Sequence, residues 1–275
     1  MHLLSRGSGY PVLFLHGIPT SCQLWTGIIE KMVSKFTCIT LDLPGLGRTA
    51  ETRPGFQDLR KLAATIDDIR IRCGIEKWHV VGHDAGSAIA VHYAHEFPER
   101  VERMALMAPS MFPDLKPFFL FEVLRKPIIG ELMAPVISVV FWKYAMQSAL
   151  DWDENLNDAV RAFRAPFGGM RGAWRLMSVM RWGNPAKVLA SIPSVLPELR
   201  QPTLIFHGSE DPAVPEAFAR RAAALIPDSE VVVLDSGHFF PMRESGLVAE
   251  ELLRFFDSHK ALDVQSVAEG AGVGA

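Results

Sequence analysis

Short apolar runs alternate along the first part of the chain with segments in which apolar residues recur every three or four positions. The runs predict buried strands at residues 11–15, 36–41, 78–81 and 101–107. The segments with helical spacing cover residues 24–33 and 59–69, and a helix rich in small residues precedes Pro98. This alternation of strand and helix predicts a parallel sheet covered by helices on both faces.

After Pro109 the pattern changes to helical stretches that are interrupted by prolines, and strands resume at residues 203–206 and 230–234. The predicted organisation therefore has four parts: 1–109 as the first part of an α/β core, 110–199 as a helical insertion, 200–258 as the second part of the core, and 259–275 as a flexible Gly/Ala-rich tail. Residues 128–146 are strongly apolar, but charges and a proline interrupt them. We therefore expect a helix beside a substrate cavity and no membrane span.

Composition restricts the function only broadly. The 275 residues carry a net charge of −3, which gives no reason to expect a nucleic acid or an anionic membrane as partner. No leader sequence is evident, and the three cysteines, Cys22, Cys38 and Cys73, favour reduced thiols in a cytoplasm over disulfides. None of them has His or Cys at metal-ligand spacing, so we expect no metal site. The oligomeric state stays open.

The segment 80–87, Val-Val-Gly-His-Asp-Ala-Gly-Ser, joins a predicted strand to a predicted helix. Gly82 and Gly86 flank Asp84 at a distance of two residues on each side. This spacing is typical of a nucleophile elbow, a strained turn that projects one side chain into a site. The glycines are needed because a Cβ would clash with the neighbouring strand or helix. The structural alternative is a turn whose aspartate caps the helix.

Three titratable residues each come just after a predicted strand, and they are Asp84, Asp211 and His238. The spacing between Asp211 and His238 accommodates one helix and one strand. Ligands of open α/β sheets bind at the carboxyl ends of the strands, so we expect these side chains to meet there. Glu210 and Asp235 are alternatives for the second carboxylate.

These motifs resemble those of the α/β-hydrolases, in particular the branch of epoxide hydrolases and haloalkane dehalogenases, whose nucleophile is an aspartate. The resemblance extends from about Gly9 to Phe256. It implies a mostly parallel sheet covered by helices on both faces, with a helical cap inserted after the strand that follows the nucleophile helix. It also implies two antiparallel strands at the start, the first of them short or absent here, and catalysis without a cofactor.

The resemblance assigns a role to each motif, in the chain order nucleophile, acid, histidine. Asp84 is the expected nucleophile, His238 the general base, and Asp211, the third residue after a glycine, the acid that orients the imidazole. Residues 16–19, His-Gly-Ile-Pro, resemble the family's H-G-x-P motif, which places oxyanion-hole N–H groups at Ile18 and Ala85. Asp42 and Gly45 resemble a structural loop near this hole.

An aspartate nucleophile suits electrophilic sp³ carbons. A serine would form an ether at such a carbon, which water does not readily cleave, whereas a carboxylate forms an ester. Water activated by His238 can then attack the carbonyl carbon of that ester, with the oxyanion hole stabilising the charge. The predicted substrates are therefore small apolar epoxides or alkyl halides.

The set of residues that would hold the leaving group is less complete than the triad. Ala85 stands where dehalogenases of this fold have a halide-binding Trp, or an Arg in those that act on fluoroacetate, and Ile18 stands where they often have Asn. Epoxide hydrolases use cap tyrosines, and here only Tyr144 lies in the cap, beside tryptophans that could donate an N–H, such as Trp142, Trp174 and Trp182. We favour an epoxide hydrolase-like activity. The alternatives are a haloalkane dehalogenase, an ester or lactone hydrolase, and a non-hydrolytic biosynthetic protein that uses the same cavity.

Overall fold

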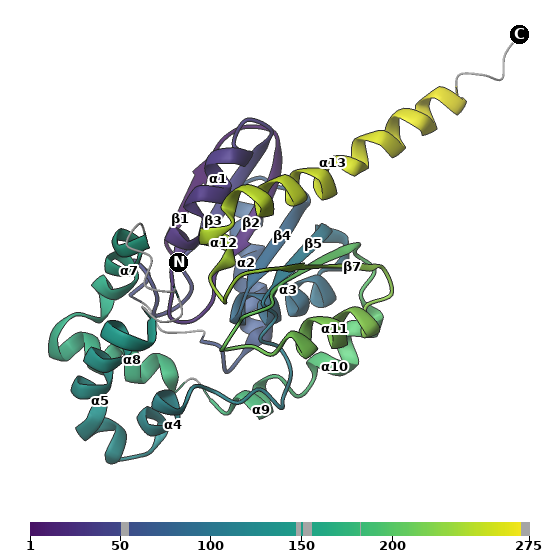
Figure 1. Ribbon diagram of the computed structural model, residues 1–275. Helices are drawn as coiled ribbons and strands as arrows, with labels where there is room; N and C mark the ends of the chain where they lie inside the picture. The colour runs from purple at the N-terminus through teal and green to yellow at the C-terminus, as the bar shows by residue number, and fades with distance from the viewer. Residues whose placement is uncertain (51–54, 147–149, 151–155, 182, 271–275) are drawn as a thin grey trace, which may run out of the picture.

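The computed structural model of the protein describes residues 1–50, 55–146, 150, 156–181 and 183–270. Its core is a seven-stranded sheet with the order β1-β3-β2-β4-β5-β6-β7 (Figure 1). The strands are β1 (Leu3–Arg6), β2 (Tyr10–Leu15), β3 (Phe36–Leu41), β4 (Trp78–His83), β5 (Val101–Met107), β6 (Thr203–Gly208) and β7 (Ser229–Leu234). Only β1 is antiparallel to its neighbour, β3, and every other pairing is parallel.

The central strands are buried on both faces, which explains why their sequences are continuous apolar runs. In β2, the side chains of Val12, Leu13, Phe14 and Leu15 have no exposed surface. Helices supply the cover: α1 (Thr26–Met32) packs against α13 (Ser245–Gly270), and α2 (Leu59–Arg72) packs against α3 (Ala85–Glu96) (Figure 1). The short helices η1 (Cys22–Trp25), η2 (Pro98–Arg100) and α12 (Phe240–Arg243), together with α11 (Glu216–Leu225), complete the core.

A helical insertion separates β5 from β6, and none of its described residues forms a strand. Its elements are α4 (Phe119–Arg125), α5 (Ile129–Val140), the π-helix η3 (Phe141–Ala145), α7 (Asn157–Arg164), η5 (Ala165–Phe167), α8 (Gly169–Met180), α9 (Pro185–Val188), α10 (Ile192–Val195) and η6 (Leu196–Glu198). In Figure 1, α4, α5, α7 and α8 form a lobe beyond one end of the sheet. The predicted fold class, a mostly parallel sheet with a helical cap after β5, is therefore confirmed.

Two ends of the chain differ in detail from the pattern. β1 has four residues and pairs only with β3, which is the short first strand that the resemblance allows. The last helix continues to Gly270, beyond the apolar positions that predict it, and residues 259–270 are rich in helix formers such as Ala, Leu and Gln. Flexibility of the tail stays a prediction. Within the described residues, no helix is both long and apolar enough to cross a membrane.

Candidate active site

Asp84 occupies the turn between β4 and α3 in a conformation that L-residues rarely adopt, with φ 52° and ψ −122°. The turn is tight on both sides. A Cβ on Gly82 would lie 2.5 Å from the carbonyl oxygen of Gly86, and a Cβ on Gly86 would lie 2.2 Å from that of Leu15. Both glycines are therefore required by close packing of the backbone, as the motif predicts.

The Asp84 carboxylate is surrounded by hydrogen-bond donors. Its Oδ1 accepts the backbone N–H of Ile18 at 3.0 Å, and the N–H of Ala85 and the hydroxyl of Ser110 are close enough to the carboxylate to lower its pKa. Gly17 permits this approach, because a Cβ there would lie 2.5 Å from Oδ1. Of the two N–H groups expected in an oxyanion hole, that of Ile18 donates to the predicted nucleophile and that of Ala85 lies nearby.

Burial raises the pKa of Asp84 above its usual value, although the positive charge of His238 and the surrounding donors oppose that shift. Part of the residue is nevertheless accessible, since Asp84 and Ala85 are only half-buried while the residues around them are buried. A carboxylate that is poorly solvated but still reachable is suited to attack a bound molecule.

His238 and Asp211 are in direct contact. The imidazole Nδ1 lies 2.7 Å from Oδ2 of Asp211, and both side chains are buried. The second carboxylate oxygen, Oδ1, accepts the N–H groups of Ala213 at 2.7 Å and Val214 at 2.9 Å, which fixes the carboxylate in place. The carboxylate therefore has one oxygen for the loop and one for the imidazole.

His238 and Asp211 each stabilise the charged form of the other. Burial alone would lower the pKa of His238, but the carboxylates of Asp211 and, to a smaller extent, Asp84 outweigh it, so the net pKa is raised. For Asp211, burial acts upward, but the imidazolium and the hydrogen bonds hold the pKa below its usual value. The arrangement keeps Asp211 ionised beside a histidine that can take up a proton.

The alternative acids do not share this geometry. Glu210 is exposed, and Asp235 accepts a hydrogen bond from the hydroxyl of Ser209 at 3.4 Å in an exposed position. Among the described contacts, the carboxylate that meets the His238 ring is that of Asp211.

Two residues of this site were missed from the sequence. Ser110 lies just after β5 and lowers the pKa of Asp84, and His83, at the end of β4, contacts the His238 ring. Nε2 of His83 donates to the backbone carbonyl of His238 at 3.0 Å, and the two rings lie 4.7 Å apart. Burial lowers the pKa of His83 to about 3, so it is a neutral support for His238. Their position at strand ends was the signal that could have identified both.

The cap residues expected to hold a leaving group differ in exposure. Trp142 is buried, stacks on Phe167 at 5.6 Å between ring centroids, and has an indole N–H without a partner among the described residues. Tyr144 and Trp174 are about half exposed, at 50% and 46%, and Lys143 lies over the Tyr144 ring. Trp182 lies outside the described residues. No described hydrogen bond joins any of these side chains to Asp84.

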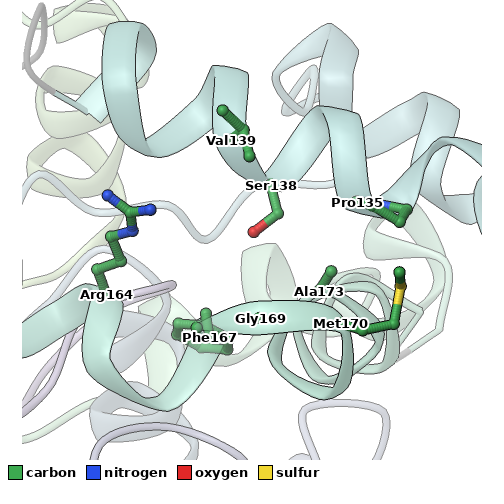
Figure 2. A pocket seen from close by; sticks show the side chains of 9 residues that line it. Pro135, Ser138, Val139, Arg164, Phe167, Gly169, Met170 and Ala173 are labelled. Atoms are coloured by element: carbon green, nitrogen blue, oxygen red, sulfur yellow. The ribbon is translucent and has the colours of Figure 1, made fainter.

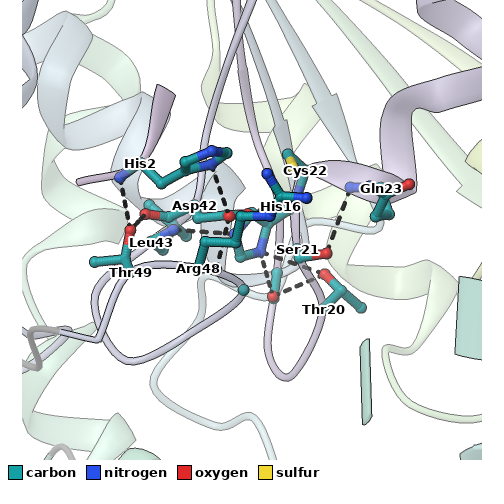
Figure 3. A network of polar contacts seen from close by, with 12 residues as sticks. His2, His16, Thr20, Ser21, Cys22, Gln23, Asp42, Leu43, Arg48 and Thr49 are labelled. Atoms are coloured by element: carbon teal, nitrogen blue, oxygen red, sulfur yellow. Dashed lines mark hydrogen bonds and ion pairs between the residues drawn. The ribbon is translucent and has the colours of Figure 1, made fainter. Parts of the chain in front are cut away.

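A second polar cluster surrounds Asp42, just past β3 (Figure 3). Its carboxylate accepts the N–H groups of Cys22 at 2.8 Å and Arg48 at 2.9 Å, and it lies 3.1 Å from Nδ1 of His2. His16 binds the same loop, because its Nε2 accepts the N–H of Leu43 at 3.0 Å. This network ties the loop after β3 to the His-Gly-Ile-Pro segment, in agreement with a structural role for Asp42.

The same cluster is the place where the fold brings metal-ligating groups together, which the sequence spacing did not indicate. His2, Cys22 and Asp42 present ligand atoms within 4.8 Å of one another. However, burial and the negative charge of Asp42 raise the pKa of the Cys22 thiol to about 12, which favours the protonated thiol. The Asp42 carboxylate is also already satisfied by N–H donors. The three residues therefore belong to the hydrogen-bonded network around Asp42. All three cysteines of the chain are free thiols.

Comparison with known proteins agrees with this architecture. A model of the alpha/beta hydrolase fold family matches residues 10–131 and 140–245. A soluble epoxide hydrolase from Corynebacterium sp. is 36% identical over 115 residues, which cover 42% of this chain and only 39% of that enzyme. A haloalkane dehalogenase from Mesorhizobium japonicum is 30% identical over 248 residues, covering 84% of this chain and 78% of that enzyme.

Among solved structures, a haloalkane dehalogenase loop variant from Bradyrhizobium elkanii superimposes with a TM-score of 0.78 at 22% identity, covering 96% of this chain and 95% of that one. At that identity the likeness concerns the fold alone. Together with the match of the family model over most of the sequence, it establishes that this chain belongs to the α/β-hydrolase family.

Proposed function

We propose that this protein is a hydrolase in which Asp84 attacks an electrophilic sp³ carbon and forms a covalent alkyl-aspartate ester. The observation that carries the proposal is the position of the aspartate: it sits on a strained elbow with Oδ1 hydrogen-bonded to Ile18, near a histidine held by Asp211. A binding protein would have no need of this combination. The favoured reaction is the opening of an epoxide in a small apolar molecule.

In the first half-reaction, Oδ2 of Asp84 is the attacking atom, because Oδ1 is engaged by Ile18. The carboxylate attacks in its ionised form, and its raised pKa makes that form a stronger nucleophile than an exposed carboxylate. The carbon–oxygen bond of the epoxide breaks as the ester bond forms. The ring oxygen then needs a proton, which a cap side chain would supply.

In the second half-reaction, His238 removes a proton from water, and the resulting hydroxide attacks the carbonyl carbon of the Asp84 ester. The oxygen that becomes negative is Oδ1, which is already beside the N–H of Ile18. The hole therefore needs no rearrangement at this step. Asp211 stabilises the imidazolium that forms, and collapse of the intermediate regenerates the Asp84 carboxylate and releases the diol. The proton on His238 then replaces the one that the cap donor gave to the ring oxygen, which completes the cycle.

A haloalkane dehalogenase is the second candidate, and the Mesorhizobium relative, which is similar over most of the chain, favours it. The same aspartate chemistry would apply, with a halide as leaving group. Against it, Ala85 and Ile18 offer no side-chain N–H to a halide. Trp142, whose N–H has no partner among the described residues, is the cap residue that could replace them. Ester or lactone hydrolysis with Asp84 as a base, and a non-hydrolytic role, remain the further alternatives.

The decisive experiment separates the two half-reactions. In His238→Gln, alkylation needs only Asp84 and should proceed, whereas hydrolysis of the ester should nearly stop. After incubation with an epoxide panel and with 1-chlorobutane, intact-protein mass spectrometry should show an adduct, and peptide mapping should place it on Asp84. An adduct with the full mass of the epoxide supports epoxide opening, while chloride release with an alkyl adduct supports dehalogenation.

Asp84→Asn is the matched control, since an amide is a poor nucleophile, and it should give neither adduct nor turnover. If a proven substrate leaves no adduct in His238→Gln and Asp84→Asn keeps substantial activity, Asp84 is not the nucleophile. Ester or lactone hydrolysis with Asp84 as a base would then be the favoured function, and hydrolysis of p-nitrophenyl esters would test it.

A further inference from the structure

Helix α5 of the cap is apolar on the side that faces away from the protein. Gly130, Ala134, Ile137 and Ser138 form its buried side. The opposite side carries six apolar residues with exposed fractions between 37% and 74%, and they are Ile129, Leu132, Met133, Val136, Val139 and Val140. At 100° per residue these six fall within an arc of about 120°, which makes one continuous stripe. We call it the α5 stripe.

The apolar surface continues from α5 onto α8. A hollow of about 150 Å³ lies between them, lined by Pro135 and Val139 of α5 and by Phe167, Met170 and Ala173 (Figure 2). Met170 is 63% exposed, and Trp174, one turn further along α8, is 46% exposed. A contiguous apolar surface of this kind is unusual on an isolated soluble protein, and such surfaces mark contact with a protein or a membrane.

Three cations lie at the ends of this surface, and the acid on α5 is paired. Lys126 precedes α5, Lys143 follows it, and Arg164 lies at one end of the hollow in Figure 2. All three are exposed, and none forms an ion pair with an acid among the described residues. By contrast, the α5 acid Glu131 is paired with Arg181. The rim of the apolar surface is therefore positively charged.

We propose that the α5 stripe and the adjoining hollow dock this protein onto a lipid surface that contains anionic headgroups. A second copy of the chain fits less well, because a two-fold interface places the same patch on both partners and brings the cations at its ends close to those of the other copy. A bilayer accepts apolar side chains at the level of the headgroups, and its phosphates complement the exposed cations. The near-neutral total charge of the chain conceals this local distribution.

The test is co-sedimentation of the full chain with vesicles of phosphatidylcholine alone and of phosphatidylcholine mixed with phosphatidylglycerol. The wild-type protein should bind the mixed vesicles more tightly. Leu132→Ser with Val136→Ser should weaken binding by roughly tenfold or more, because two exposed apolar anchors are lost. Lys126→Glu with Lys143→Glu should abolish the preference for phosphatidylglycerol.

Ile71→Ser with Leu247→Ser is the matched control. Both residues lie on the surface of the α/β core, outside the cap, and they are as exposed as the stripe residues. This variant should bind vesicles like the wild type, and circular dichroism should show that all variants are folded. Equal binding to both vesicle types, or a stripe variant that binds like the control, would overturn the proposal. A second result would also overturn it: a wild type that sediments as a dimer and a Leu132→Ser, Val136→Ser variant that sediments as a monomer. The stripe would then be a protein interface.

Discussion

The active-site end of the sheet and the cap differ in how their side chains are held. At the carboxyl ends of the strands, Asp84, Asp211 and His238 have defined partners, because each lies within hydrogen-bond distance of a backbone donor or of another of the three. In the cap, α5 has few polar contacts and exposes apolar side chains, and the candidate donors Tyr144 and Trp174 are half exposed. One region is fixed before any ligand arrives, and the other offers mostly apolar surface.

This difference suggests a division of labour. The core would determine the type of bond formed, because the nucleophile and its supporting groups are rigidly placed there. The cap would determine which molecule is accepted and how its leaving group is held. Arg175 of α8 connects the two regions, since its guanidinium donates to the carbonyls of Gly45 at 2.9 Å and Thr49 at 2.9 Å in the loop after β3.

The largest expected effect tests whether the core site is complete. Asp211→Asn should slow hydrolysis of the alkyl-enzyme by roughly 10³- to 10⁴-fold, because the amide no longer holds the imidazole in the required tautomer. Alkylation of Asp84 should change much less. Single-turnover kinetics with a proven substrate would measure both steps. Asp235→Asn is the control, since Asp235 is exposed and near His238 in sequence, and an equal loss there would refute the assignment of the acid.

An intermediate effect tests the role of the cap. If a cap side chain donates a proton or a hydrogen bond to the epoxide oxygen as the ring opens, replacing it should lower the alkylation rate by roughly 10²-fold. Tyr144→Phe, Trp142→Phe, Trp174→Phe and Trp182→Phe form the set to compare by pre-steady-state adduct formation. We expect one of the four to show this loss while the others stay near the wild-type rate. Wild-type rates in all four would place the acid elsewhere and weaken the proposed division of labour.

The smallest effect concerns the charges around His238, whose folded-state pKa is raised above the usual 6.5. Asp211→Asn should lower that pKa, and Asp84→Asn should lower it by less, as NMR titration of the imidazole can measure. Because the folded-state pKa is raised, protonation of His238 stabilises the fold below the unfolded-state pKa, and this contribution is lost as pH rises through the folded-state value. Urea unfolding across that range should show the decline, and Asp211→Asn should flatten it. An unmoved pKa in both variants would show that the carboxylates do not control it.

The strands and the order of the site residues were predictable because they depend on local patterns. β3 and β5 occupy the predicted ranges, since each is an apolar run with a clear boundary. The elbow was recognisable because two close backbone contacts demand glycine at positions 82 and 86. The choice of Asp211 over Glu210 and Asp235 came from a resemblance, and the hydrogen bond to His238 now supports it physically.

The rest depends on how distant segments meet. Ser110 and His83 lie at strand ends, but their importance comes from neighbours that β5, β4 and the loop of His238 bring close. The exposed side of α5 was equally hidden, because a helix that is apolar all round predicts burial and periodicity does not say which side is covered. The apolar residues 128–146 predict a helix beside a substrate cavity. In the structure three of its residues line a hollow, and the stripe faces outward.

The backbone of Asp84 has a consequence for the evolution of this protein. Its φ of 52° and ψ of −122° suit glycine far better than aspartate, and such strain costs on the order of 1–3 kcal/mol. Burial of the carboxylate adds to this cost. A population selected only for resistance to heat would therefore drift towards glycine at position 84 and lose the nucleophile. Keeping the aspartate requires a fold with stability to spare, so mutations that stabilise the sheet elsewhere would widen the range of cap sequences the protein can tolerate.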